Sequence, residues 1–264
     1  MKKKLEKLIK LCVFLLTLFL FSSANNLSNP LVLMPQARIA VGASYMLGGY
    51  SLTNREVPSI FNRFYGSVSY APVSFCNFGI DAGATQLEVA GDTTSVDTFG
   101  IFHGEYGFSG GGHIKLGTPF LFNNLLAIIA IFHGTTFSSK NNNGTIYSGL
   151  DACGGIGVQF HISSFGYITA GSQIYLITGK NKNYLGQKGY YSNVNNMRVW
   201  IGFDYFPKAN IETKNLLYVS FETAISPKVK FNARAPVEEI SFSVSVGSVT
   251  PQLYGKKTEI DWNP

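Results

Sequence analysis

Charged side chains are scarce in this sequence, and they recur at alternate positions within apolar segments. Of the 264 residues 14% are charged, compared with roughly 25% in an average soluble domain. Because successive residues of an extended strand point to opposite faces, one face collects most of the titratable groups. The titratable residues assigned to this face are Asp81, His103, Glu105, His113, Lys115, Asp151, His161, Arg198, Asp204, Glu222 and Glu239.

A subset of these residues is expected to form a buried charge network. A charge that faces a narrow interior needs an opposite charge or water as a partner, because an isolated buried ion is costly. The alternative interpretation is an ion pathway lined by the same side chains. The predicted network consists of Glu105, Lys115, Asp151, Arg198, Asp204 and Glu222, with Arg198 paired to Asp204 or Glu222 and Lys115 paired to Glu105 or Asp151.

Hydrolytic chemistry is the main catalytic alternative. The tetrapeptide Ile-Phe-His-Gly occurs at residues 101–104 and 131–134, and each copy supplies a histidine. His133 precedes Ser138 and Ser139, which is the residue pair that a base and its nucleophile require. These serines lie in an asparagine-rich segment without an acid to orient the histidine. We therefore predict no catalytic residue, and a hydrolase remains the weaker alternative.

No metal, nucleotide or other cofactor site is predicted. Cys76 and Cys153 do not form a CxxC pair and do not neighbour a histidine at metal-ligand spacing. We expect them to behave as small apolar side chains, with a single disulfide as the alternative. The glycine runs 110–112 and 154–155 lack the Gly-Lys-Ser/Thr of a phosphate loop.

Alternation of apolar with small or polar residues predicts β-strands through most of the chain. It is regular where Ile240, Phe242 and Val244 alternate with serines. Residues 98–117 are interpreted as one strand of continuous alternation, in which the triple glycine marks either a bend or a turn. Ten strands are expected, at about 37–50, 61–71, 76–89, 98–117, 124–137, 146–162, 165–178, 191–206, 215–227 and 238–249.

The connections between these strands alternate in length. Long segments are expected at 51–60, 90–97, 138–145, 179–190 and 228–237, and shorter ones between them. This asymmetry is typical of an up-and-down barrel whose two ends face different compartments. An even strand number places both termini at the end with the short turns.

Residues 1–24 have the three parts of a cleavable secretory signal peptide. A lysine-rich start is followed by an apolar stretch and by the small residues of a cleavage site. This segment holds five lysines and one glutamate, so the net charge of +6 falls to +2 without it. Nucleic-acid binding is therefore set aside, because no basic stripe with interleaved aromatic residues remains.

The whole pattern resembles the small outer-membrane β-barrel proteins of Gram-negative bacteria. It comprises the signal peptide, the long amphipathic strands and the unequal loops. The non-apolar face is rich in glycine, serine and alanine, which suits a narrow barrel interior. Aromatic residues near strand ends suit the interfacial girdles of such barrels. The assigned girdle residues are Tyr45, Tyr70, Phe108, Phe160, Phe203 and Tyr205.

The resemblance implies an all-β, antiparallel transmembrane barrel of about ten strands. Its expected organisation is a signal peptide at 1–24, a periplasmic segment at 25–36, the barrel at 37–249 and a C-terminal extension at 250–264. The extension departs from the family pattern, in which the last strand ends on a terminal aromatic residue. The implied partners are outer-membrane lipid, lipopolysaccharide and the barrel-assembly machinery.

The expected role is non-enzymatic: structural support, surface interaction or passage of small solutes. The alternative of a different class is a soluble periplasmic β-protein that binds a ligand. Residues 180–191 carry three lysines and three tyrosines, which suit contact with lipopolysaccharide phosphates or a surface ligand. An ordinary solvated loop is the competing interpretation of this segment.

Overall fold

The alternating pattern produces an all-β architecture in the computed structural model of the chain. The structure describes residues 34, 36–52, 58–90, 101–119, 121, 125–163, 166–206, 216–226 and 240–253. Among these residues no helix is long and apolar enough to cross a membrane. The strands are β1 (Arg38–Ser51), β2 (Pro58–Val73), β3 (Cys76–Val89), β4 (Phe102–His103), β5 (Gly107–Gly117), β6 (Leu126–Lys140), β7 (Ile146–Ser163), β8 (Gly166–Lys182), β9 (Lys188–Tyr205), β10 (Leu216–Ile225) and β11 (Ile240–Val249).

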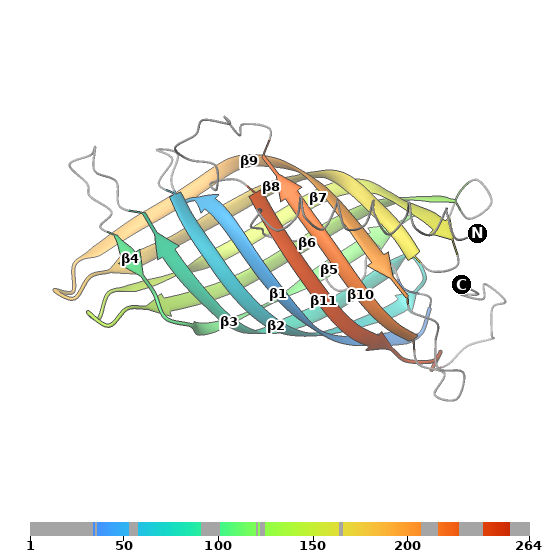
Figure 1. Cartoon of the computed structure of the whole chain (residues 1–264), viewed down its shortest axis with the longest axis horizontal. Helices are drawn as coiled ribbons and strands as arrows, with labels where there is room; N and C mark the ends of the chain where they lie inside the picture. The colour runs from blue at the N-terminus through green and yellow to red at the C-terminus, as the bar shows by residue number, and fades with distance from the viewer. Residues whose placement is uncertain are drawn as a thin grey trace, which may run out of the picture.

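The strands close into an antiparallel barrel, because β1 pairs with β2 on one side and with β11 on the other. Strand β4 has only two residues. Both β4 and β5 pair with the same strand, β3. The two pieces share one place in the wall, so ten strands surround the interior. Figure 1 shows the strands running obliquely around an elongated barrel. The predicted fold class and strand number are confirmed.

A one-residue shift between β4 and β5 corrects the prediction of continuous alternation across 98–117. Val89 pairs with Phe102 and Thr85 pairs with Gly107. The segment 102–107 therefore holds one residue more than the stretch 85–89 of β3 that it faces. An extra residue reverses which side chains face inward. Phe102 is accordingly buried in the interior, whereas Phe108 is 73% exposed.

This shift overturns two of the predicted inward positions. His103 and Glu105 are both exposed, and Glu105 lies between β4 and β5 rather than within a strand. The triple glycine at 110–112 lies inside β5, which passes through it without a turn. Gly111 is required there because a Cβ would lie 1.9 Å from the Gly134 carbonyl oxygen of β6.

Two of the segments predicted as long loops, 138–145 and 179–190, are partly strand. Strands β6 and β7 pair from Lys140 and Ile146 onward, so residues 141–145 connect them. Strands β8 and β9 pair from Lys182 and Lys188 onward. Both hairpins reach the left end of the barrel in Figure 1, which is called the long-loop end below. The other end, with the turn at 73–76, is called the short-turn end.

The inner wall contains three rows of the same composition, each made of one aromatic residue and two glycines on adjacent strands. In each row an aromatic residue covers paired glycines on the next two strands, an arrangement that fills the space the glycines leave. A Cβ on Gly42 would lie 2.0 Å from the Tyr218 hydroxyl oxygen, so only glycine fits beneath this ring. The rows are Tyr218–Gly247–Gly42, Trp200–Gly171–Gly157 and Tyr191–Gly179–Gly149.

Several sequence-based predictions concern residues outside the described ranges. They include the signal peptide at 1–24, the loops at 90–97 and 228–237, and Glu239. Of the predicted extension at 250–264, the first four residues are described. Thr250 and Leu253 donate backbone hydrogen bonds to Ile39 and Ala37, so this stretch continues alongside β1.

Candidate functional site in the barrel interior

Strand β2 places inward side chains at successive levels of the barrel interior. From the long-loop end they run from an aromatic ring, Phe61, through Arg63 and Ser67 to Ser69 and Ala71. The alternating residues of the other strands fill the same levels. Most of the interior is therefore occupied by side chains, in keeping with the narrow lumen of a ten-strand barrel.

An apolar cluster closes the interior at the long-loop end. Its aromatic rings contact one another directly, as in the pair Tyr50 and Tyr175, whose centroids lie 4.5 Å apart. Rings packed at this distance exclude water from the space between them. The cluster consists of Tyr50, Leu52, Phe61, Leu87, Val89, Phe102, Phe137, Tyr147, Tyr175, Ile177 and Tyr191.

Directly below this cluster lies the arginine layer, formed by Arg63, Arg198 and Asp151. Arg63 Nη1 donates to Asp151 Oδ2 at 2.5 Å, and both side chains are buried. Arg198 Nη2 donates to the Gly49 carbonyl oxygen at 2.8 Å. This layer contains two guanidinium groups and one carboxylate.

Aromatic faces complete the surroundings of both arginines. Arg63 Cζ lies 4.5 Å from the Phe61 ring centroid and 5.8 Å from that of Phe137. Arg198 Cζ lies 4.5 Å from the Tyr50 centroid and 5.3 Å from that of Tyr175. Ring faces attract cations, so they stabilise guanidinium groups that hydrogen bonds satisfy only in part.

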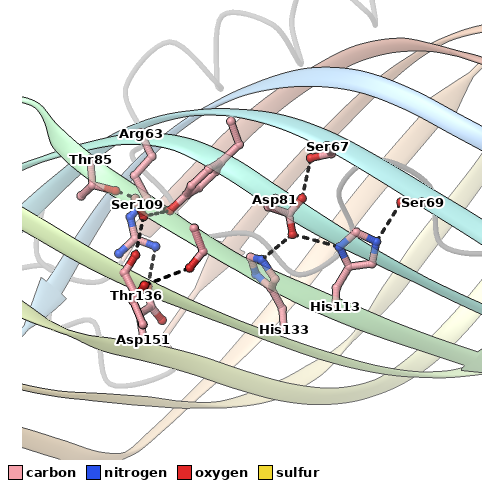
Figure 2. A network of polar contacts seen from close by, with 12 residues as sticks. Arg63, Ser67, Ser69, Asp81, Thr85, Ser109, His113, His133, Thr136 and Asp151 are labelled. Carbon is pink, nitrogen blue, oxygen red and sulfur yellow. Dashed lines mark hydrogen bonds and ion pairs between the residues drawn. The ribbon is translucent and has the colours of Figure 1, made fainter.

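The histidine layer, formed by Asp81, His113 and His133, lies nearer the short-turn end. Asp81 Oδ2 is 3.0 Å from His113 Nδ1 and 3.3 Å from His133 Nε2. Ser67 Oγ donates to Asp81 Oδ1 at 2.5 Å. Figure 2 shows both imidazole rings directed at this one carboxylate.

Ser69 extends the histidine layer into a serine–histidine–aspartate chain. Its Oγ lies 2.9 Å from His113 Nε2, while His113 Nδ1 contacts Asp81 (Figure 2). This connectivity is the one that activates a serine nucleophile in hydrolases. Ser69 is only 1% exposed, so a substrate carbonyl does not reach its hydroxyl in this conformation.

The sequence-predicted network is only partly brought together. Lys115, Asp204 and Glu222 are all buried, and Lys115 lies within electrostatic reach of both acids. Asp204 accepts a hydrogen bond from Ser220. Glu105 is not part of this interior group, because its side chain is exposed.

The structure shows contacts of Asp151 and Arg198 that were not predicted. Asp151 pairs with Arg63, a residue outside the predicted network. Arg198 contacts the Gly49 carbonyl oxygen and the rings of Tyr50 and Tyr175. These contacts depend on the distances between strands on opposite sides of the barrel. The alternation of residues along a single strand gives no information about those distances.

Several interior residues were missed from the sequence. Arg63 lies at an alternate position together with Phe61, Tyr65 and Ser67, so the sequence pattern predicts that it points inward. His133 contacts Asp81, whereas the sequence suggests only Ser138 and Ser139 as its partners. His161 was placed inward, and its ring stacks on Tyr167 with centroids 5.1 Å apart. Cys76 and Cys153 are free thiols, as expected.

The outer face of the barrel has the opposite character. Ile80, Ile156 and Ile174 are each more than 60% exposed, and they point away from the charged interior. Large contiguous apolar surfaces are rare on soluble monomers. Here the apolar side chains surround the wall, and the buried side chains include arginine, lysine and carboxylates. The distribution is inverted relative to that of a soluble protein.

Comparisons with known proteins return barrels of several functions. No protein-family model matches the chain, and no curated protein matches it. Among solved structures, the translocator domain of the autotransporter NalP from Neisseria meningitidis is 9% identical, with a TM-score of 0.48, over 81% of this chain and 88% of that one.

Two other solved structures illustrate the range of functions. The outer-membrane protease OmpT from Escherichia coli is 8% identical, with a TM-score of 0.42, over 84% of this chain and 98% of that one. The Pseudomonas putida toluene transporter TodX is 12% identical, with a TM-score of 0.30, over 82% of this chain and 89% of that one.

Proposed function

We propose that this chain is an integral outer-membrane β-barrel protein that acts through its structure and its outer surfaces rather than through chemistry. The observation that carries the proposal is the apolar outer wall around a charged interior. Lipid is the solvent that matches such a wall. A closed barrel also pairs its backbone groups between strands, as a hydrocarbon environment demands.

The membrane proposal is tested by heat modifiability. The mature protein is extracted from membranes and run on a detergent gel with and without boiling. We expect extraction to require detergent and the unboiled band to migrate differently, because a closed barrel resists detergent unfolding. A freely soluble protein without a mobility shift would contradict the proposal and favour the periplasmic ligand-binding alternative.

We further propose that the lumen is blocked, so that passage of small solutes is not the main role. The aromatic cluster covers the long-loop end, and Arg63 and Arg198 beneath it are fully buried. At the short-turn end Met34 packs with Tyr218 and Phe206 in a second cluster. Purified protein in a planar bilayer is expected to give no stepwise conductance. Stable conductance steps would establish a pore instead.

A hydrolase is the second candidate, and the Ser69–His113–Asp81 chain is the observation that favours it. A fluorophosphonate probe labels serines that such a chain activates. We expect no labelling of the folded protein, because Ser69 is buried. Labelling that disappears in the Ser69→Ala variant but persists in Ser67→Ala would show that the site opens and would replace the non-enzymatic proposal.

A further inference from the structure

The hairpins β6–β7 and β8–β9 bring four lysines together on the outer wall at the long-loop end. Lys140 of β6 is paired with Ile146 of β7, which is paired with Lys182 of β8. Lys182 is in turn paired with Lys188 of β9. Three lysines therefore lie in one row across four strands, and all three are exposed.

A fourth lysine lies next to this row. Lys180 is one outward position below Lys182 on β8, and its partner on β9 is Tyr190. Lys180 is exposed and Tyr190 is 78% exposed. The four side chains Lys140, Lys180, Lys182 and Lys188 are called the lysine patch below.

The lysine patch faces outward rather than into the lumen. Lys180 and Lys182 share the alternation of Ile174, which is 64% exposed on the barrel wall. The inward positions of the same strand are Tyr175 and Ile177, both buried. The patch is thus continuous with the apolar outer wall.

The two hairpins that carry the patch supply no acidic group next to it among the residues that the structure describes. Residues 138–149 and 177–193 contain no aspartate or glutamate. Glu105 lies at one end of the row, where its backbone N–H donates to the Lys140 carbonyl oxygen. Lys182 and Lys188 are directly opposite each other, and like charges in that arrangement destabilise a strand pair. An external anion between them would remove this repulsion.

The height of the patch above the apolar wall favours a lipid headgroup as the source of this anion. Lys180 lies six residues beyond Ile174, which is about 20 Å along a strand and roughly 15 Å along the axis of a barrel with strands tilted by about 40°. Leu150, 40% exposed on β7, marks the last large apolar side chain of the wall before the patch. An interfacial tyrosine beside lysines at this height is typical of the lipid headgroup region.

We propose that the lysine patch binds the phosphate groups of a phosphorylated glycolipid in the leaflet around the long-loop end. The inference rests on the proposed membrane insertion and assigns the ligand, the residues and the side of the barrel. Flexible ammonium groups suit phosphates as point charges. The Tyr190 ring and the apolar wall below it face the acyl chains of the same lipid.

The test compares three forms of the full chain folded in lipid vesicles. One is the wild type, one carries Lys→Gln at all four positions, and a matched control carries Lys→Arg at all four. Vesicles contain zwitterionic phospholipid with or without lipid A. We expect lipid A to raise the temperature at which the unboiled gel band is lost in the wild type and in the Arg variant, but not in the Gln variant.

A binding measurement accompanies the stability measurement. Phosphorus retained per protein after detergent purification from lipid A vesicles is expected to fall by about tenfold or more in the Gln variant, as the loss of four charge contacts implies. Inorganic phosphate at matched concentration is expected to give no stabilisation, which separates a headgroup from the free anion. Equal retention by the Gln variant and the wild type overturns the inference.

The design separates the two levels of the argument. If the wild type enters no vesicle and shows no gel shift, the proposed membrane function fails. If all three forms insert and respond equally to lipid A, only the assignment of the lysine patch fails. The gel shift of the Gln variant in zwitterionic vesicles shows that the variant folds.

Discussion

The arginine layer and the histidine layer hold buried charge in two different ways. In the arginine layer, Arg63 pairs with the one carboxylate, Arg198 donates to a backbone carbonyl, and both guanidinium groups rest on aromatic rings. In the histidine layer, one carboxylate is surrounded by two imidazoles and a hydroxyl. The first layer compensates cations with ring faces, and the second compensates an anion with hydrogen bonds. Their responses to substitution should therefore differ in size and in kind.

Asp151→Asn is expected to give the largest effect. Arginine remains charged in any surroundings, so loss of the carboxylate leaves Arg63 as a buried cation without its counter-charge, with ring faces alone beside it. The free energy of unfolding should fall by about 3–5 kcal/mol. Denaturant titration of the vesicle-folded protein measures it. The control Glu105→Gln, at an exposed site, should change stability by no more than about 0.5 kcal/mol.

Asp81→Asn tests the other layer and should cost less, about 2–3 kcal/mol. The amide still accepts one hydrogen bond, and an imidazole, unlike a guanidinium, does not have to carry a charge. The same titration compares it with Asp151→Asn. A larger loss for Asp81→Asn than for Asp151→Asn would reverse the proposed distinction between the layers.

The contribution of ring faces is tested at Tyr50. Tyr50→Leu removes the ring on which Arg198 lies and should cost about 1–2 kcal/mol through the lost cation–π contact and poorer packing. Tyr50→Phe keeps the ring and removes a buried hydroxyl that has no hydrogen-bond partner, so it should be nearly neutral. Equal losses for both variants would show that the hydroxyl, not the ring, carries the effect.

A single hydroxyl of the histidine layer should give the smallest effect. Ser67→Ala removes one hydrogen bond to Asp81 and should cost about 1 kcal/mol. Ser44→Ala is the matched control, because the buried Ser44 hydroxyl has no hydrogen-bond partner. If the two variants unfold at the same denaturant concentration, the Ser67 contact contributes nothing to stability.

The two Ile-Phe-His-Gly segments show what the sequence could and could not predict. Alternation correctly predicted the strand number, the closed antiparallel barrel and an interior position for Lys115, Asp151, Arg198, Asp204 and Glu222. At 101–104 the histidine is exposed, whereas at 131–134 the histidine reaches Asp81. Identical local sequence therefore takes opposite faces, because the shift between β4 and β5 is set by pairing with β3.

Partner choice across the lumen was also beyond the sequence. The alternation placed Asp151 and Arg198 inside, but it gave no distance between strands that are not neighbours. Asp151 of β7 and Arg63 of β2 meet only because the wall closes into a circle. The Tyr50 ring under Arg198 is equally nonlocal, since it comes from β1, whereas Tyr175 lies on the neighbouring strand β8.

The row Tyr218–Gly247–Gly42 differs from the other two rows in when its contacts can form during folding. The rows under Trp200 and Tyr191 join β7, β8 and β9, which follow one another along the chain. The row under Tyr218 joins β10 and β11 to β1, at opposite ends of the sequence. Loop-closure entropy makes such a contact the slowest to form. The Tyr218 ring thus favours the correct register when the barrel closes, because it fits only if β1 pairs with β11 so that Gly42 lies opposite Gly247.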